Sequence, residues 1–182
     1  MTASSYVLLD DSLTPGGRSL LYAEPERIVA AYAPGEVETG LDEISAGLSR
    51  GLHAAGFFSY ELGYYLEPKL ETLLPADRRV PLFWIGLFGA PRPRDDSGTR
   101  AWLDDHGGTE RAKISDLKLS WSREQYDRAF SAVEDYIAAG DVYQINLTLK
   151  YRFAFEGDPI ALYAALRRKQ RVAYGALIHT PE

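Results

Sequence analysis

The chain has 182 residues, of which 46% are hydrophobic and 25% are charged, the balance of an ordinary globular protein. Its formal net charge of −6 argues against a broad phosphate-binding surface, so nucleic acid is not expected as a partner. It has no cysteine, which excludes disulfides and thiolate chemistry, and no apolar run approaches the ~20 residues of a membrane span, so we expect a cytoplasmic protein without a membrane segment.

The first half is predicted to be rich in strands, with one helix. Apolar runs predict five strands, over residues 6–9, 19–22, 28–32, 57–60 and 80–88. The second and third of these are expected to pair around Glu24-Pro25. Between them and the fourth strand, apolar residues recur at helical spacing from Leu41 to Leu52, and Gly56 is predicted to end that helix.

A change of composition follows between about residues 90 and 116. Proline, glycine and aspartate interrupt this stretch, and only Arg100–Leu103 could form a short strand. We therefore predict a first domain over residues 1–90, a linker or excursion over 91–120, and the start of a second domain over 121–182.

The second half begins with a helix signature. Ser122 followed by Gln125 is a capping box, an apolar stripe follows it, and Gly140 is predicted to end the helix. From Val142 to Phe153 polar and apolar residues alternate, which predicts a long strand with Gln144, Asn146 and Thr148 on its polar face.

A second helix is predicted from Asp158-Pro159, and a last strand over 172–178. The order of elements predicts an α+β fold with large, mostly antiparallel sheets flanked by helices. The cations Arg167, Arg168, Lys169 and Arg171 are expected to complement the dipole at the end of the second helix.

No common catalytic motif is present in the sequence. It lacks a phosphate-binding loop, a dinucleotide fingerprint and a serine nucleophile elbow, and its three histidines lack the spacing of metal ligands. Adjacent acidic pairs such as Asp10-Asp11 and Asp95-Asp96 are expected to be solvated turn formers. From the residues alone, the prediction ends at an α+β domain.

One segment carries a family resemblance. Residues 139–148, AGDVYQINLT, resemble the signature that opens the chorismate-binding domain of aminodeoxychorismate and anthranilate synthases. The helix before it is similar to the family's first helix of that domain, and residues 55–68 resemble its N-terminal domain. Residues 7–11 and 17–21 stand where the family has its short N-terminal pocket motifs. Four matches in order identify the chain as resembling component I of these synthases, as an N-terminal fragment.

The resemblance implies an incomplete chorismate-using synthase fold. Residues 1–90 would be the N-terminal component I domain, and residues 121–182 the truncated start of the chorismate-binding domain. In the family, ammonia from a glutamine amidotransferase subunit replaces a hydroxyl on chorismate, with Mg²⁺ holding a substrate carboxylate. The metal ligands lie in the later part of that domain, so we expect no metal site and no activity in this fragment.

The resemblance also implies site residues. Alternation alone favours a polar face that meets water, but the resemblance places Gln144 in the substrate cavity, where related isochorismate-forming synthases carry a lysine that activates water. A neutral glutamine instead favours nitrogen as the nucleophile. A tryptophan-type pocket is expected at Asp11, Ser12, Arg18, Ser19, Ala173, Tyr174 and Gly175. Because Asp11 and Ala173 depart from the family's pattern, we expect tryptophan to bind weakly or not at all.

The resemblance favours one branch of the family. The stretch Tyr60–Pro68 and the altered tryptophan motif fit aminodeoxychorismate synthase, a transferase or lyase that leads to para-aminobenzoate and folate. The deciding lysine lies beyond residue 182. Three alternatives stay open: anthranilate synthase component I of tryptophan biosynthesis, a non-catalytic small-molecule-binding module, and an unrelated structural α+β domain.

Overall fold

The computed structural model describes residues 5–107 and 112–180. The chain divides into two compact units, the first made of residues 1–106 and 166–182 and the second of residues 107–165. Every strand pairing within them is antiparallel, and helices accompany the sheets, so the predicted α+β class is confirmed. None of the helices in the described part of the chain is long and apolar enough to cross a membrane.

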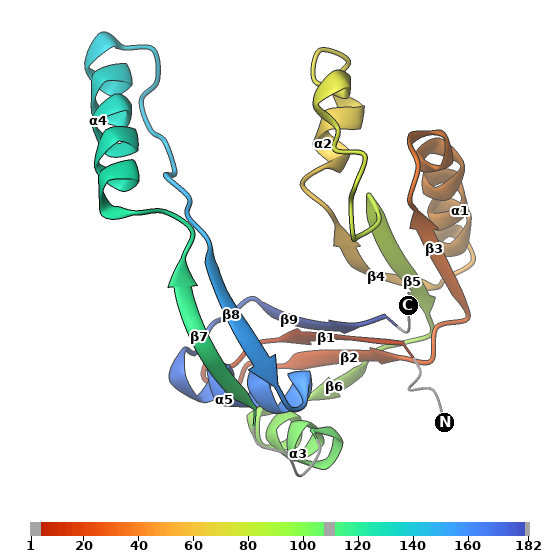
Figure 1. The fold of residues 1–182 in the computed structure, drawn as a ribbon. Helices are drawn as coiled ribbons and strands as arrows, with labels where there is room; N and C mark the ends of the chain where they lie inside the picture. The colour runs from red at the N-terminus through yellow and green to blue at the C-terminus, as the bar shows by residue number, and fades with distance from the viewer. Residues whose placement is uncertain (1–4, 108–111, 181–182) are drawn as a thin grey trace. The chain divides into compact units, whose positions relative to one another are not determined.

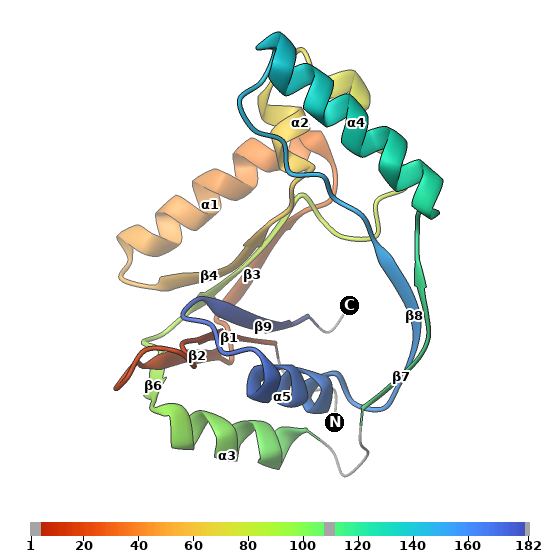
Figure 2. The same ribbon diagram turned by 90° about the vertical axis from the view of Figure 1, so that its left-hand side faces the viewer.

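The first sheet pairs a strand near the start of the described residues with one near their end. Its order is β6-β2-β1-β9, with bounds Arg92–Arg94, Ser19–Ala23, Tyr6–Asp10 and Gly175–His179 (Figure 1). Helix α3 (Asp96–His106) and the end of helix α5 (Pro159–Lys169) lie beside one face of this sheet (Figure 2). The rings of Tyr6 and Trp102 meet edge to face there, with centroids 5.1 Å apart.

The second sheet has the order β3-β5-β4, with bounds Arg27–Ala31, Phe83–Phe88 and His53–Phe58. Every residue of β5 is buried, as its continuous apolar run predicts for a strand covered on both faces. Helix α1 (Val37–Ser49) covers one face through Val37 and Ile44, which pack into a core with Phe83 and Leu87. Shorter helical segments follow the strands: η1 (Pro34–Glu36), α2 (Leu62–Leu66) and η2 (Glu71–Leu73).

The two sheets pack against each other through their remaining faces. Val7 and Tyr22 from the first sheet form a second core with Ala55, Trp84 and Phe88 from the other. The first unit is therefore layered, with α1 outside the second sheet and α3 with the end of α5 outside the first (Figure 2). Burial of these apolar faces supplies the driving force for the arrangement.

The second unit consists of a strand pair and a helix. Strands β7 (Lys113–Leu119) and β8 (Tyr151–Glu156) pair with a bulge near Asp116, whose φ is 52°. In helix α4 (Arg123–Ala139), the Gln125 amide donates to Ser122 Oγ at 3.3 Å and the Ser122 amide to Gln125 Oε1 at 2.7 Å. Gly140 ends the helix with φ 80°. The predicted capping box and stop are confirmed.

The predicted pairing around Glu24-Pro25 is wrong. Strand β2 pairs with β1 and β6, whereas β3 pairs with β5 in the other sheet. Glu24 has a left-handed φ of 57°, and the Glu26 amide donates to the Leu87 carbonyl at 2.8 Å. Since Pro25 has no amide to donate, the turn sends the chain into the second sheet instead of closing a hairpin.

Two further boundaries differ from the sequence prediction. Arg100–Leu103 is helical, because the Asp95 carboxylate accepts hydrogen bonds from the Gly98 amide at 2.7 Å and Ser97 Oγ at 2.9 Å and so caps α3. Gly56 lies inside β4 and does not end a helix. A Cβ at that position would approach the Trp84 carbonyl oxygen to 2.0 Å, so close strand contact explains the glycine.

The long strand predicted over Val142–Phe153 is also wrong. Strand β8 spans only Tyr151–Glu156, and its partner β7 ends opposite Tyr151. Residues 142–150 have no strand partner within the described ranges, so their alternating pattern does not produce a ladder. The residues predicted as a linker, 91–120, contain β6, α3 and β7. The domain boundaries at residues 90 and 120 stay a prediction.

Candidate functional site

A buried ion-pair cluster lies where β1 ends. Arg167 Nε is 2.7 Å from Asp10 Oδ2, and Arg167 Nη2 lies 3.1 Å from Asp10 Oδ1 and 2.8 Å from Asp96 Oδ1. Ser19 Oγ donates to the same Asp10 carboxylate at 2.7 Å. The side chains of Asp10 and Arg167 are only 1% and 6% exposed. The expectations of a solvated Asp10 and of an Arg167 that serves the helix dipole are therefore wrong, because each is the other's buried partner.

The opposite charges in this cluster stabilise the ionised forms of one another. Burial by itself lowers the pKa of Arg167, but hydrogen bonds and charge from Asp10 and then Asp96 outweigh it, so this pKa lies above its ordinary value. A bidentate contact between guanidinium and carboxylate also fixes geometry. The cluster thus joins the end of β1 to α5 and the start of α3.

A second set of bonds joins the same two parts of the chain beside the cluster. The Ser12 amide donates to the Val172 carbonyl at 2.9 Å, and the Val172 amide donates to Ser12 Oγ at 3.0 Å, although the residues are 160 positions apart. The Arg171 guanidinium donates to the Ser12 carbonyl. These bonds hold the segment after α5 against the segment after β1.

Asp11 forms the turn that leaves β1. Its Oδ1 accepts from the Thr14 amide at 2.9 Å and the Leu13 amide at 3.2 Å. Hydrogen bonds from Thr14 lower the pKa of Asp11, and those from Leu13 and the charge of Arg171 add to the effect, while burial opposes it. The carboxylate is therefore anionic at neutral pH and occupied by its own turn.

A pocket of about 440 Å³ lies over these elements. Strand register places Leu9 opposite both Leu20 and Ala176, so these three residues form its apolar floor. The pocket is lined by Leu9, Asp10, Asp11, Arg18, Leu20, Ala173, Tyr174, Gly175 and Ala176. It therefore combines an apolar base with one cation, Arg18, and with Asp11, while the Asp10 carboxylate is buried in the ion-pair cluster.

The structure gathers the predicted tryptophan-type residues around this pocket. Five of the seven line it: Asp11, Arg18, Ala173, Tyr174 and Gly175. The other two, Ser12 and Ser19, are 1% exposed and make the bonds that hold its walls. Sequence reasoning misses the floor residues Leu9, Leu20 and Ala176, which the alternation of β1 would identify once its two partner strands were known. The ligand of the pocket stays a prediction.

Gln144 lies apart from this pocket, in the segment between α4 and β8. Its side chain is exposed, and Nε2 is 3.4 Å from Asn146 Oδ1. Thr148 Oγ1 donates to the Asn146 carbonyl at 3.2 Å. In this structure the Gln144 side chain is exposed, and its catalytic role stays a prediction.

A metal ion such as Mg²⁺ needs several carboxylate or other oxygen ligands close together. Among residues 5–107 and 112–180, no three histidine, aspartate or glutamate side chains lie together in a way that could hold one. The described residues therefore do not fit Mg²⁺, which prefers carboxylate oxygens.

Comparison with known proteins identifies the family. The model of the family described as chorismate binding enzyme matches residues 17–182. Aminodeoxychorismate synthase component 1 of Escherichia coli is 26% identical over 141 residues, which cover 69% of this chain and 31% of the relative. The protein of the same name from Klebsiella aerogenes is 29% identical over 146 residues, covering 71% and 32%.

Relatives from the other branch match as well. Anthranilate synthase component 1 of Thermus thermophilus is 26% identical over 190 residues, covering 90% of this chain and 40% of the relative. The chain spans about a third of the length of the aminodeoxychorismate synthase relatives, with shares of 31% to 33%. The resemblance drawn from the sequence is confirmed: this chain belongs to the family of chorismate binding enzymes.

Proposed function

We propose that the chain is part of component 1 of an aminodeoxychorismate synthase, which aminates chorismate toward para-aminobenzoate and folate. The observation that carries this proposal is that four relatives of that name each match 69% to 71% of the chain. Such an enzyme is a transferase or lyase acting in the cytoplasm.

Anthranilate synthase component 1 is the second candidate. Two relatives of that name match only 56 and 51 residues of this chain, although the Thermus relative matches 90% of it. The pocket beside β1 favours the first candidate. An anionic Asp11 lines that pocket and repels a ligand carboxylate, which suits an enzyme that is not under tryptophan feedback.

The proposed enzyme needs a partner and a metal. The name component 1, borne by the relatives, supports a second component, which we propose is a glutamine amidotransferase that supplies ammonia. Mg²⁺ would neutralise a substrate carboxylate. Because the described residues lack a carboxylate cluster, we propose that its ligands lie outside them, and no step involving the metal is assigned to this chain.

Gln144 is the residue of this chain that we propose for the substrate cavity of the complete enzyme. Its amide can donate to a ring hydroxyl or accept from ammonia, but it cannot take a proton from water as a lysine can. The neighbouring Asn146 lies within 3.4 Å and would orient the amide. This role requires further chain to cover the exposed segment.

Growth complementation tests the proposal. The full-length gene that contains the coding sequence of this chain is introduced into a strain that lacks aminodeoxychorismate synthase component 1, and separately into one that lacks anthranilate synthase component 1. We expect growth without para-aminobenzoate in the first strain and no growth without tryptophan in the second. The reverse result would support anthranilate synthase, and growth of neither strain would support a non-catalytic binding module.

A further inference from the structure

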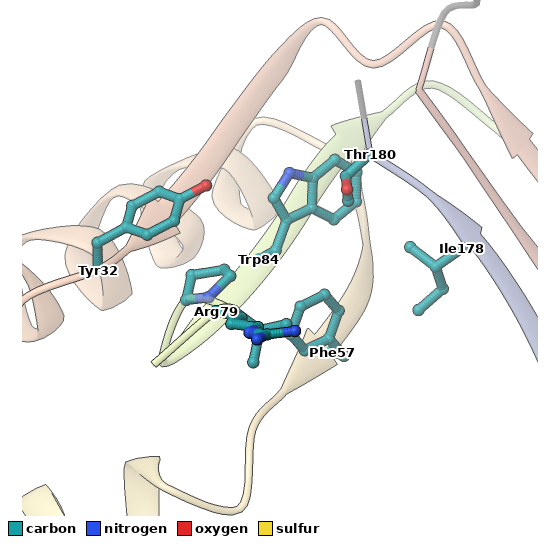
Figure 3. A pocket seen from close by; sticks show the side chains of 8 residues that line it. Tyr32, Phe57, Arg79, Trp84, Ile178 and Thr180 are labelled. Atoms are coloured by element: carbon teal, nitrogen blue, oxygen red, sulfur yellow. The ribbon is translucent and has the colours of Figure 1, made fainter. Parts of the chain in front are cut away.

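A second pocket, of about 450 Å³, lies in the first unit and is distinct from the one beside β1. Phe57 and Trp84 are partners on paired strands, and in Figure 3 Tyr32 lies on one side of them and Ile178 and Thr180 on the other. Arg79 also lines the pocket. Val80 and Pro81 complete the wall. Its volume lies within the range of small-molecule sites, about 300–1,000 Å³.

The walls of this pocket are fixed by the surrounding fold. Trp84 is 4% exposed and belongs to the core between the sheets, so its indole cannot move aside easily. The Tyr32 amide donates to Glu36 Oε2 at 2.7 Å, and Arg78 donates to the Tyr32 carbonyl. The Leu82 amide donates to the Ala31 carbonyl at 2.6 Å, which anchors the loop that carries Arg79. A preformed pocket of this kind binds without a large ordering cost.

The lining of this pocket is mainly apolar and aromatic, with a single charged side chain. Of the eight lining residues, all within the described chain, three are aromatic and only Arg79 is charged. Arg79 is exposed and forms no hydrogen bond or ion pair with any residue that the structure describes. The neighbouring Arg78, in contrast, uses its guanidinium to hold the Pro75 and Tyr32 carbonyls. Arg79 is thus the cation available for a ligand.

From these observations we infer that the pocket binds a small aromatic carboxylate. The rings of Phe57, Trp84 and Tyr32 provide apolar faces against which a planar ring can pack. The planar guanidinium of Arg79 matches a carboxylate with two parallel hydrogen bonds. The site lies outside the residues proposed for the chorismate reaction and outside the pocket beside β1.

Calorimetric titration of the full chain with benzoate tests the inference, with benzamide as the uncharged analogue of the same shape and acetate as the carboxylate without a ring. We expect saturable binding of benzoate and at least about tenfold weaker binding of the other two, since a hydrogen-bonded charge and a buried ring are each worth that much. Arg79→Gln should remove the preference for benzoate over benzamide. Arg50→Gln, at another exposed arginine outside the pocket, should preserve it.

Three results would overturn the inference. The first is no binding of benzoate at 10 mM, which is roughly the weakest affinity of interest. The others are equal binding of benzoate and benzamide, and an unchanged preference for benzoate in Arg79→Gln. Circular dichroism melts of both variants show whether they remain folded, and Arg79→Lys gives a second variant that keeps the charge but loses the planar fork. Binding here is independent of the product of the enzyme. A failed titration and a failed complementation are therefore separate outcomes.

Discussion

The two units of this chain differ in how they use their apolar residues. In the first unit every residue of β5 is buried, and two cores lie on either side of the sheet that contains it. In the second unit none of the residues of α4, all of them described, is buried, and Phe130 and Ile137 are 44% and 45% exposed. Among the described residues, amphipathic patterning thus forms cores in the first unit and leaves the apolar face of α4 exposed. The first unit is therefore stabilised by two packed cores, whereas α4 contributes no buried side chain to the second.

The largest expected effect is the loss of the buried cation. Arg167→Met should lower the free energy of unfolding by about 3–5 kcal/mol, because the buried Asp10 carboxylate would lose the Arg167 cation that neutralises it. Urea titration measures the loss, and Arg168→Met, on the exposed side of the same helix, is the control with little expected effect. A double variant with Asp10→Asn should lose less than the sum of the two single losses. Additive losses would show that the pair is not coupled.

A matched pair of leucines compares the two units directly. Leu87→Ala in β5, at 0% exposure, should cost about 2–5 kcal/mol through lost burial and a cavity. Leu119→Ala in β7, at 50% exposure, should stay within about 0.5 kcal/mol. Urea unfolding of both variants measures the difference. Equal losses would mean that the second unit is as well packed as the first.

The helix cap of α4 gives a smaller, local effect. Ser122→Ala removes the acceptor of the Gln125 amide and should cost about 1 kcal/mol of helix stability. Hydrogen exchange should become faster for the amides in the first turn of α4 and stay unchanged in β5. Faster exchange in both units would contradict the separation between local and tertiary stability.

The smallest effect concerns Asp11 and pH. Its pKa is lowered in the folded protein by the Thr14 hydrogen bonds, so its contribution to stability is present above the ordinary aspartate pKa of about 3.9 and is lost as pH falls through the folded value. Asp11→Asn should therefore weaken the acid dependence of the melting temperature below that pH. An unchanged acid dependence would show that the turn does not depend on the charge.

The sequence predicts a structural feature correctly when the residues that form the feature are close together in the sequence. The cap of α4 is confirmed because Ser122, Gln125 and Gly140 make local contacts. The partners of β2 and β3 are not predicted correctly, because pairing depends on segments far along the chain. The alternation of polar and apolar residues over Val142–Phe153 favours a strand, but a strand forms a hydrogen-bonded ladder only where a neighbouring strand pairs with it.

The candidate site shows the same division. Family resemblance groups Asp11, Arg18 and residues 173–175, and the structure places them around one pocket. The family resemblance does not indicate that Asp10 and Arg167, which are 157 positions apart, form the buried ion pair beneath that pocket. Adjacent acidic and basic residues are ordinarily solvated, so only the fold distinguishes Asp10 from Asp11 and Arg167 from Arg168.

Product identification tests the central claim most directly. The product of the full-length gene is combined with a glutamine amidotransferase, chorismate, glutamine and Mg²⁺, and the reaction products are separated and identified by mass spectrometry. If the chain is part of aminodeoxychorismate synthase component 1, we expect a product in which an amino group has replaced a ring hydroxyl while the enolpyruvyl side chain is retained. Anthranilate together with free pyruvate, and no such product, would contradict the account.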